Sequence, residues 1–269
     1  MSNTTSSPRN SSTTSASDLQ AEIDQLGPWF HNLHFPGGVQ TAPNHFLGDF
    51  PSFKWKAIAP YVPEDLSGWK VLDIGCNAGF FSFRLAERGA DVTAIDLDPH
   101  YLQQARWAAE KFGLADRVTF RKMQLYELAQ SDEQYDLVWF MGVLYHLRYP
   151  LLALDIVARK TRRLMMFQTM TLPGEEVCEV PPDLTLEERE AMRQPGWPMM
   201  AFIEHRLASD PTNWWAPNHA CVEAMLRSAG FEVLSRPCHE VYLCQPSVSS
   251  NAEIAELMED EYRAATAQR

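Results

Sequence analysis

The sequence predicts a doubly wound α/β fold with a mostly parallel seven-stranded sheet, one strand of which is antiparallel. Short apolar segments alternate with helical segments from residue 70 to residue 168, as in strands joined by crossover helices. A turn containing two glycines follows the first apolar segment, and acidic residues follow the second. The last two apolar segments, in GFEVLSRPCHEVYLC, are close enough to form a hairpin, which makes one strand antiparallel to the others.

The individual elements follow from hydrophobic periodicity and from turn residues. We expect strands at residues 71–74, 91–95, 118–121, 136–140, 164–168, 231–234 and 240–244. Helices are expected between them at residues 80–88, 100–112, 151–160 and 217–229. Further helices are expected outside the sheet at residues 19–26, 54–61 and 252–265, and an acidic one at 184–192.

The chain divides into four regions by composition. Residues 1–18 are rich in Ser and Thr, and we expect them to be disordered because they contain almost nothing to bury. Residues 19–69 combine helices with an aromatic loop, either a lid over the site or a loop packed under the first helix. Residues 70–250 form the α/β domain with a proline-rich insertion at 172–213, and residues 251–269 form a C-terminal helix.

Charge and cysteine content disfavour several classes of protein. The net charge of −12 and the pI of about 5.1 disfavour nucleic acid as a partner. The five cysteines are odd in number and none is in a C-x-x-C pair, so we expect neither a disulfide framework nor a metal site. Without a long apolar run or a secretory leader, we expect a cytoplasmic protein with no membrane partner.

The stretch VLDIGCNAGFFSFRLAERGADVTAIDLD, residues 71–98, carries the main functional signal. A strand that leads through a glycine turn into a helix presents backbone N–H groups at the helix start. Gly75 and Gly79 allow a ligand to approach the backbone closely. Asp96, 21 residues after Gly75, is placed to accept hydrogen bonds from ribose hydroxyls. The stretch therefore predicts a nucleoside-type cofactor, and its glycine spacing departs from the G-x-G-x-x-G dinucleotide pattern.

With VLDIGCNAG as its glycine loop and AIDLD as its ribose-binding acid, the chain resembles the class I S-adenosylmethionine-dependent methyltransferases, which have a Rossmann-like fold. The resemblance covers about residues 54–244 and implies S-adenosylmethionine as the cofactor. It implies that the methionine part is bound by Asp73, Gly75, Asn77 and Gly79, and the ribose by Asp96. It also places Leu97, Gln124 and Leu125 around the adenine and Met141 beside the methyl group. Core filling is the alternative role of Met141.

Three further segments, FKWKAIAPYV, MGVLYHLRYPLLAL and NWWAPNHACVEAMLRSAGF, resemble the branch that contains the tRNA wobble-uridine carboxymethyltransferase and its small-molecule relatives. That enzyme uses a carboxylated cofactor, whose extra carboxylate needs cationic partners. Here Lys54 is present, but Gly37, Gly38 and Gln40 stand where a further basic residue is expected. We therefore expect ordinary methyl transfer to an oxygen, nitrogen or sulfur of a small molecule or glycan.

Candidate catalytic and substrate-binding residues lie outside the glycine loop. His146 and Tyr145 follow the fourth strand, and His146 is the candidate general base because its pKa is ordinarily close to neutrality. A structural histidine bonded to a loop carbonyl is the alternative for His146. Adjacent tryptophans suit a ring-shaped or apolar acceptor, with core packing as the alternative. The full set of candidate substrate-binding residues is His31, His34, Lys54, Trp214, Trp215 and His219.

Several functions remain in competition at this level. Methyl transfer to a small molecule or glycan is the leading hypothesis. A tRNA wobble-uridine-modifying enzyme is the second, disfavoured by net charge, and a non-catalytic cofactor-binding partner subunit is the third. A dinucleotide-dependent dehydrogenase is a distant fourth. The acceptor and the oligomeric state cannot be read from the residues.

Overall fold

The computed structural model describes residues 15–248 and 251–267 and divides the chain into two compact units, Met1–Phe53 and Lys54–Arg269. In the first unit, helix α1 spans Ala16–Leu26 and starts three residues before its predicted beginning. It starts there because the hydroxyl of Ser15 accepts a hydrogen bond from the backbone N–H of Asp18, at 3.2 Å. The first 14 residues of the predicted disordered tail lie outside the described part of the chain.

The aromatic loop after α1 is held by its own hydrogen bonds. A 3₁₀ turn, η1, spans Pro36–Gly38, and an isolated bridge pairs His34 with Gln40. The hydroxyl of Thr41 accepts from the N–H of Leu33 and donates to the carbonyl of His31, both at 2.7 Å. Helix α2 (Ser52–Ile58) and the 3₁₀ turn η2 (Ala59–Tyr61) then replace the single predicted helix at residues 54–61.

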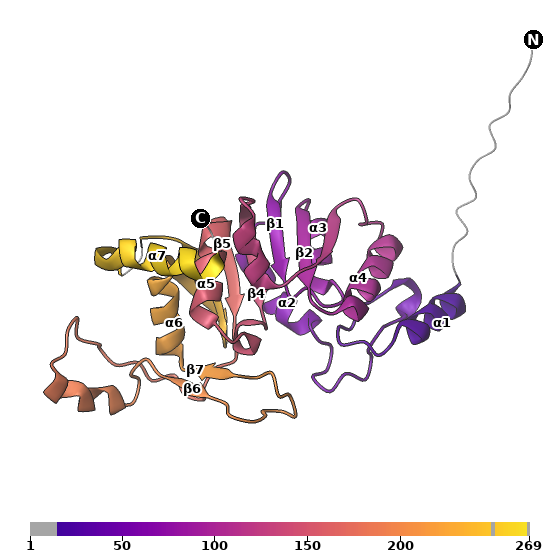
Figure 1. Ribbon diagram of the computed structural model, residues 1–269. Helices are drawn as coiled ribbons and strands as arrows, with labels where there is room; N and C mark the ends of the chain where they lie inside the picture. Colours follow the sequence, from indigo (N-terminus) through magenta and orange to yellow (C-terminus); the bar gives the residue numbers. More distant parts are fainter. Residues whose placement is uncertain (1–14, 249–250, 268–269) are drawn as a thin grey trace, which may run out of the picture. The chain divides into compact units, whose positions relative to one another are not determined.

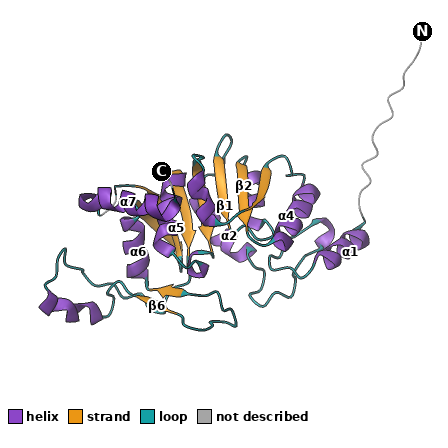
Figure 2. Ribbon diagram, viewed as in Figure 1, coloured by secondary structure: helices purple, strands orange, loops and turns teal. Residues whose placement is uncertain are grey.

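The second unit is built on a seven-stranded sheet, in the order β3-β2-β1-β4-β5-β9-β8 (Figures 1 and 2). Strand β9 is antiparallel to both of its neighbours, and the remaining pairs are parallel. The predicted fold class is therefore confirmed. The strands are β1 (Lys70–Ile74), β2 (Asp91–Asp96), β3 (Val118–Lys122), β4 (Tyr135–Met141), β5 (Thr161–Gln168), β8 (Phe231–Cys238) and β9 (Val241–Pro246).

Helices cover both faces of this sheet. Helices α3 (Phe80–Glu87) and α4 (Pro99–Phe112) pack on β1 to β3, whereas α5 (Pro150–Lys160) packs with α6 (His219–Ser228) and α7 (Ala255–Thr266). Because the strand order reverses between β1 and β4, right-handed crossovers place these two groups on opposite faces. Ligands of such folds bind where the order reverses, above the carboxyl ends of β1 and β4. In the described residues, no helix combines the length and apolar character needed to cross a bilayer.

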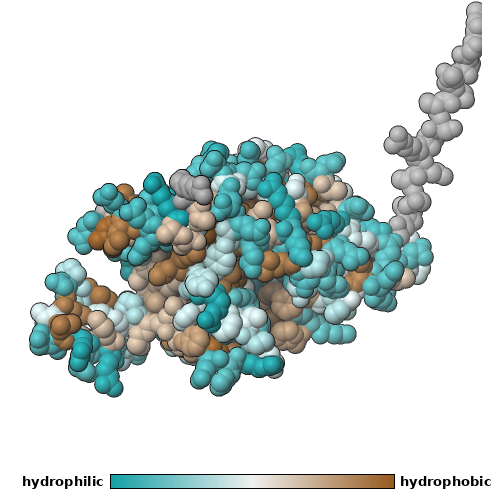
Figure 3. All heavy atoms as spheres, viewed as in Figure 1, coloured by the Kyte–Doolittle hydropathy of each residue, from teal (hydrophilic) through white to brown (hydrophobic). Residues whose placement is uncertain are grey.

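The insertion between β5 and α6 contains a small sheet that the sequence did not predict. The predicted acidic helix is a 3₁₀ helix, η5 (Leu186–Arg193), and strands β6 (Met200–Phe202) and β7 (Trp215–Pro217) pair with each other. The prediction that Pro217 opens a helix is wrong, because Pro217 ends β7 and Asn218 caps α6. This insertion exposes several apolar side chains, among them Val177, Val180, Leu186 and Met192. Figure 3 shows brown, hydrophobic atoms at the surface of the molecule.

Candidate active site

The glycine loop has the left-handed backbone that its sequence requires. Between β1 and α3, Gly75 and Gly79 have φ angles of +71° and +85°, and Asn77 has φ of +49°. A Cβ atom on Gly75 would lie 2.4 Å from Cγ2 of Val143, and one on Gly79 would lie 2.7 Å from the Phe83 ring. The two glycines therefore allow the loop to pack against the protein itself, a role beyond the ligand approach that the sequence indicated.

Asp96 joins the end of β2 to the glycine loop. One carboxylate oxygen accepts from the N–H of Asn77 at 2.8 Å, and the other accepts from the N–H of Asp98 at 2.9 Å. Burial raises the pKa of Asp96. Each carboxylate oxygen has a second lone pair, so this geometry leaves acceptor capacity for a ribose diol at the position that the sequence indicated.

Asp73 lies beneath the loop rather than on an open surface. It is 2% exposed, and the hydroxyl of Ser82 in α3 donates to its Oδ2 at 2.5 Å. Burial raises the pKa of this carboxyl to about 7, with the Asp96 charge contributing in the same direction. Asp73 thus ties β1 to the first turns of α3 and changes charge close to neutral pH.

The predicted adenine-facing residues differ in their exposure. Leu97 is half exposed, whereas the side chain of Leu125 is buried in the hydrophobic core. The backbone N–H of Gln124 donates to Glu127 at 2.7 Å, which starts the 3₁₀ helix η3 (Leu125–Gln130). Leu97 and Gln124 therefore present groups that can contact a base, while Leu125 anchors the loop.

The end of β4 brings together residues from three segments. Met141 is buried, and Gly142 has φ of +74°. A Cβ atom on Gly142 would lie 3.7 Å from both the Tyr145 hydroxyl and Oε1 of Gln168, the last residue of β5. Burial, with Glu240 contributing, raises the pKa of Tyr145 to about 12. Tyr145 is therefore a neutral hydrogen-bond donor at physiological pH, and it cannot act as a base there.

His146 is held by the insertion through its Nδ1 atom. This atom lies 3.3 Å from the carbonyl oxygen of Thr212 and 2.9 Å from its hydroxyl, which donates to Asp210 at 2.6 Å. A carbonyl can only accept, so Nδ1 carries the proton and Nε2 carries the lone pair. Burial lowers the pKa of His146, so the ring is neutral at pH 7. This geometry fits the structural alternative and also leaves a basic nitrogen.

Glu240 is a candidate functional residue that the sequence reasoning missed. It lies in the tight turn between β8 and β9, with φ of +65°. Its carboxylate accepts from the N–H of Thr171 at 2.7 Å and from Nε2 of Gln168 at 3.2 Å. Burial lowers the pKa of Lys54, while the charges of Glu240 and Cys238 oppose that shift. Only the pairing of β9 with β5 places this carboxylate at the site, so no local sequence signal identifies it.

The two tryptophans fasten the insertion to the turn that carries His146. Trp214 donates its backbone N–H to the carbonyl of Tyr145 at 2.8 Å, and its ring lies under the guanidinium of Arg148 at 4.2 Å. The indole N–H of Trp215 donates to the carbonyl of Leu147 at 3.0 Å. Both rings remain partly exposed. These contacts support the packing alternative, and acceptor binding by the exposed ring edges stays a prediction.

The predicted substrate-binding histidines lie in different places. His219, the first residue of α6, is 1% exposed and contacts Tyr242, Arg236 and Glu175. His31 and His34 belong to the first unit, where Nε2 of His34 lies 2.6 Å from Asp49. The roles of these three histidines toward a substrate stay predictions.

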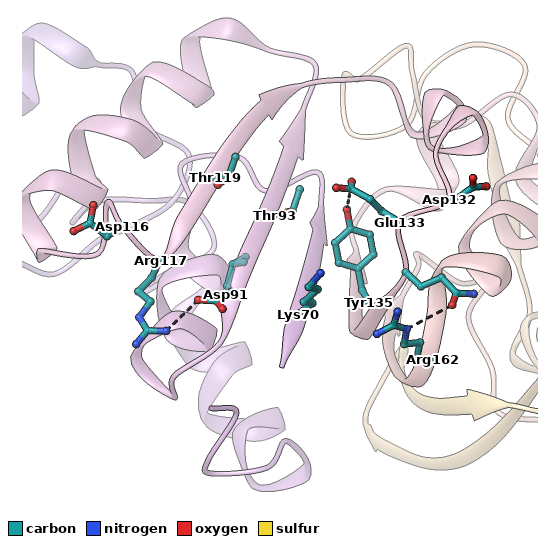
Figure 4. Close-up of a pocket in the computed structure, with 12 residues that line it drawn as sticks. Lys70, Asp91, Thr93, Asp116, Arg117, Thr119, Asp132, Glu133, Tyr135 and Arg162 are labelled. Carbon is teal, nitrogen blue, oxygen red and sulfur yellow. Dashed lines mark hydrogen bonds and ion pairs between the residues drawn. The ribbon is translucent and has the colours of Figure 1, made fainter. Parts of the chain in front are cut away.

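A separate polar pocket opens at the amino ends of the strands, opposite the carboxyl ends that carry the glycine loop (Figure 4). Its volume is about 310 Å³, and Lys70, Asp91 and Tyr135 are among its lining residues. Two of its charged groups pair with each other, Arg117 with Asp91 at 3.0 Å. This pocket lies away from the glycine loop and is not the predicted site.

Comparisons with known proteins agree with this geometry. Residues 71–164 match the family described as a methyltransferase domain. The tRNA U34 carboxymethyltransferase of Pseudomonas paraeruginosa is 31% identical over 66% of this chain and 49% of its own length. Its counterpart from Pseudomonas aeruginosa strain LESB58 is 30% identical over 79% of this chain and 60% of its own length. The chain thus spans about half to three-fifths of these relatives.

Solved structures show the same fold at lower identity. The N-terminal domain of EvdMO1, crystallised in the presence of SAH and D-fucose, has a TM-score of 0.60 and 21% identity, over 89% of this chain and all of that one. The [4+2]-cyclase SpnF has a TM-score of 0.51 and 18% identity, over 82% and 71% of the two chains, so the fold alone does not determine the reaction. Together with the family match, the glycine loop and the acid that ends β2 identify the chain as a class I S-adenosylmethionine-dependent methyltransferase that resembles the tRNA U34 carboxymethyltransferases.

Proposed function

We propose that the chain binds S-adenosylmethionine at the glycine loop and methylates a hydroxyl of a small molecule or glycan. The observation that carries the choice is the position of the Glu240 carboxylate. It is close enough to Lys54 and Tyr145 for its charge to favour the protonated form of each, which opposes the fall in the pKa of Lys54 on burial and adds to the rise in the pKa of Tyr145. A cofactor with an extra carboxylate needs a cationic side chain whose charge is not already balanced by another carboxylate. Here a carboxylate already offsets the charge of Lys54, and Tyr145 is neutral, so the site favours the ordinary sulfonium cofactor.

The proposed chemistry is an in-line displacement, for which the cofactor supplies an electrophilic methyl group on a sulfonium. The acceptor oxygen forms a bond to the methyl carbon, and the electron pair of the broken carbon–sulfur bond stays on sulfur. The hydroxyl proton passes to Nε2 of His146, the nitrogen that carries the lone pair. Tyr145 and Gln168, whose polar atoms both lie near Gly142, orient the reacting groups.

The EvdMO1 neighbour, crystallised with SAH and D-fucose, supports a sugar acceptor. Net charge supports the same choice, because a chain with net charge −12 repels a polyanion such as tRNA. A tRNA wobble-uridine substrate is the second candidate, and the names of the curated relatives at about 30% identity favour it.

Calorimetric titration separates these candidates. We expect S-adenosylmethionine to bind at least tenfold more tightly than its carboxylated analogue, and Glu240→Gln to narrow that gap by removing the like charge. Asp96→Ala should weaken S-adenosylmethionine binding at least tenfold, because the ribose diol loses its acceptor. Tighter binding of the carboxylated analogue by the wild-type chain would refute the proposal and favour the tRNA candidate.

A labelled-methyl assay then tests the acceptor class. We expect transfer to a panel of free and activated sugars and none to undermodified tRNA. His146→Ala should reduce turnover while leaving the S-adenosylmethionine affinity unchanged. Labelling of tRNA instead of sugars would reverse the assignment, and a chain that binds the cofactor without any transfer would refute catalysis by this site.

A further inference from the structure

Three potential metal ligands meet beside the acceptor end of the site. Glu175 comes from the insertion, His219 from the start of α6, and His239 from the turn between β8 and β9. One ligand atom from each lies within 4.8 Å of the other two. His239 immediately precedes Glu240, whose partner Gln168 faces Gly142. The cluster is therefore connected to the end of β4 through the hydrogen-bonded side chains of Glu240 and Gln168.

The distances in this cluster fit a small divalent cation. Oε1 of Glu175 lies 3.2 Å from Nε2 of His219 and 3.2 Å from Nδ1 of His239. Ligands bound tetrahedrally at about 2.0–2.1 Å are separated from one another by about 3.3 Å. Two of the three ligand separations therefore already match a zinc-like site. Two imidazoles and one carboxylate also leave coordination positions for other oxygens.

Arg236 is the cationic neighbour that such a site must accommodate. Its Nη2 lies 2.8 Å from Oε2 of Glu175, so it occupies the carboxylate oxygen that does not face the histidines. The same Nη2 lies 3.1 Å from both ring nitrogens of His219. An atom in the ring plane at that distance from both would overlap Cε1, so Nη2 lies over the ring face. Arg236 therefore does not occupy the in-plane lone pair of Nε2, which lies 3.2 Å from Oε1 of Glu175.

The surroundings keep two of the three groups, His219 and Glu175, in the forms that bind a metal ion. Burial and the charge of Arg236 lower the pKa of His219, which keeps its imidazole neutral. The Arg236 guanidinium lowers the pKa of Glu175, which keeps its carboxylate ionised. The hydroxyl of Tyr242 is hydrogen-bonded to Nδ1 of His219. That contact fixes the ring and, when the phenol accepts, leaves Nε2 unprotonated, as in the outer shell of metal-bound histidines.

We propose that Glu175, His219 and His239 hold a divalent transition-metal ion, and that its remaining positions take hydroxyl oxygens of the methyl acceptor. The part of this inference that concerns the acceptor rests on the proposed function. A bound divalent cation would orient a sugar diol toward the methyl group and lower the pKa of the hydroxyl. The proton of that hydroxyl still passes to His146, so the cation adds to the base and does not replace it.

Metal binding is tested on full-length protein without a polyhistidine tag, in the absence of cofactor and acceptor. The probes are Zn²⁺ in calorimetry and Co²⁺ in visible absorption. The variants are Glu175→Gln and His239→Ala, whose side chains are 59% and 62% exposed, so folding is preserved. The matched control is His205→Ala, an exposed histidine beside Glu204 in the same insertion. Circular dichroism checks the fold of each variant.

We expect one Zn²⁺ per chain, at least tenfold weaker binding in each ligand variant, and unchanged binding in the control. No Zn²⁺ uptake, equal affinity in all variants, or an equal loss in the control would overturn the site. An intense sulfur-to-cobalt band would also overturn it, because the ion would then lie on a cysteine such as Cys238. S-adenosylmethionine titrated on the same variants should bind normally, so a failure of cofactor binding refutes the proposed function and leaves the metal result intact.

Discussion

Gly75→Ala perturbs the point where the glycine loop meets the end of β4. An alanine there must keep φ of +71°, which costs about 1–2 kcal/mol for a residue with a Cβ atom. Its Cβ would lie 2.4 Å from Cγ2 of Val143, and such overpacking costs about 1–3 kcal/mol. Val143 is β-branched and has one stiff side-chain torsion, so it relieves the overlap poorly. We expect Gly75→Ala to lower the free energy of unfolding by about 2–5 kcal/mol.

A double-mutant cycle with Val143→Ala separates the two contributions. Val143 is partly buried, so its truncation alone should cost about 1 kcal/mol. In the double variant the steric part of the Gly75→Ala cost should disappear, which gives a coupling free energy of about 1–3 kcal/mol. The backbone part should remain. Urea denaturation followed by circular dichroism measures all four proteins, and additive costs would refute the reasoning.

The same four proteins test the ligand role of Gly75. If the glycine is needed only for packing against Val143, the double variant should bind S-adenosylmethionine almost as tightly as Val143→Ala. If the missing Cβ also makes room for the ligand, the double variant should keep a weakened affinity while its stability recovers. We expect the second result, because the loop both packs on the protein and faces the carboxyl ends of β1 and β4.

Three further predictions follow from single contacts. The buried carboxyl of Asp73 has a pKa of about 7, above its ordinary 3.8, so its protonation should stabilise the fold as the pH falls from 8 to 5. Urea denaturation should show this gain, about 3 kcal/mol over that range, in the wild type and not in Asp73→Asn. Asn218→Ala removes the cap of α6 and the hydrogen bond to the carbonyl of Trp197, at 2.7 Å. It should lower the free energy of unfolding, measured by urea denaturation, by about 2–3 kcal/mol, and a loss below 1 kcal/mol would contradict the capping role. Tyr145→Phe removes a neutral donor, so it should lower kcat without moving the pH profile of the labelled-methyl assay, and a shifted profile would show that Tyr145 titrates.

Local sequence signals were sufficient where a single segment determines the structure. The alternation of strands and helices predicted the sheet, and AIDLD located Asp96 at the end of β2. Two of the errors at element ends concern the starts of helices. The cap at Ser15 starts α1 earlier than expected, and Asn218 rather than Pro217 begins α6. In both cases the side-chain cap determined the boundary more strongly than hydrophobic periodicity did.

The acceptor side of the site could not be predicted in the same way, because its residues come from segments far apart in the chain. Glu240 reaches Gln168 only because β9 pairs antiparallel with β5. Asp210 and Thr212 reach His146 only because the insertion folds back through Trp214. Polar residues in loops carry no periodicity, so single-segment patterns cannot indicate which of them will meet.

This difference between the two sides bears on how the enzyme acquires its specificity. The cofactor side is built from consecutive segments of the sheet, between β1 and β4, and lies within the residues that match the methyltransferase domain family. The proposed acceptor side depends on the segment between β5 and α6, which supplies Glu175, Asp210, Thr212 and the two tryptophans. Changes in the insertion can therefore alter the acceptor while leaving the glycine loop and Asp96 untouched. Identity of about 30% to tRNA-modifying relatives is accordingly compatible with a different acceptor, and the insertion is the segment whose exchange should transfer acceptor preference between them.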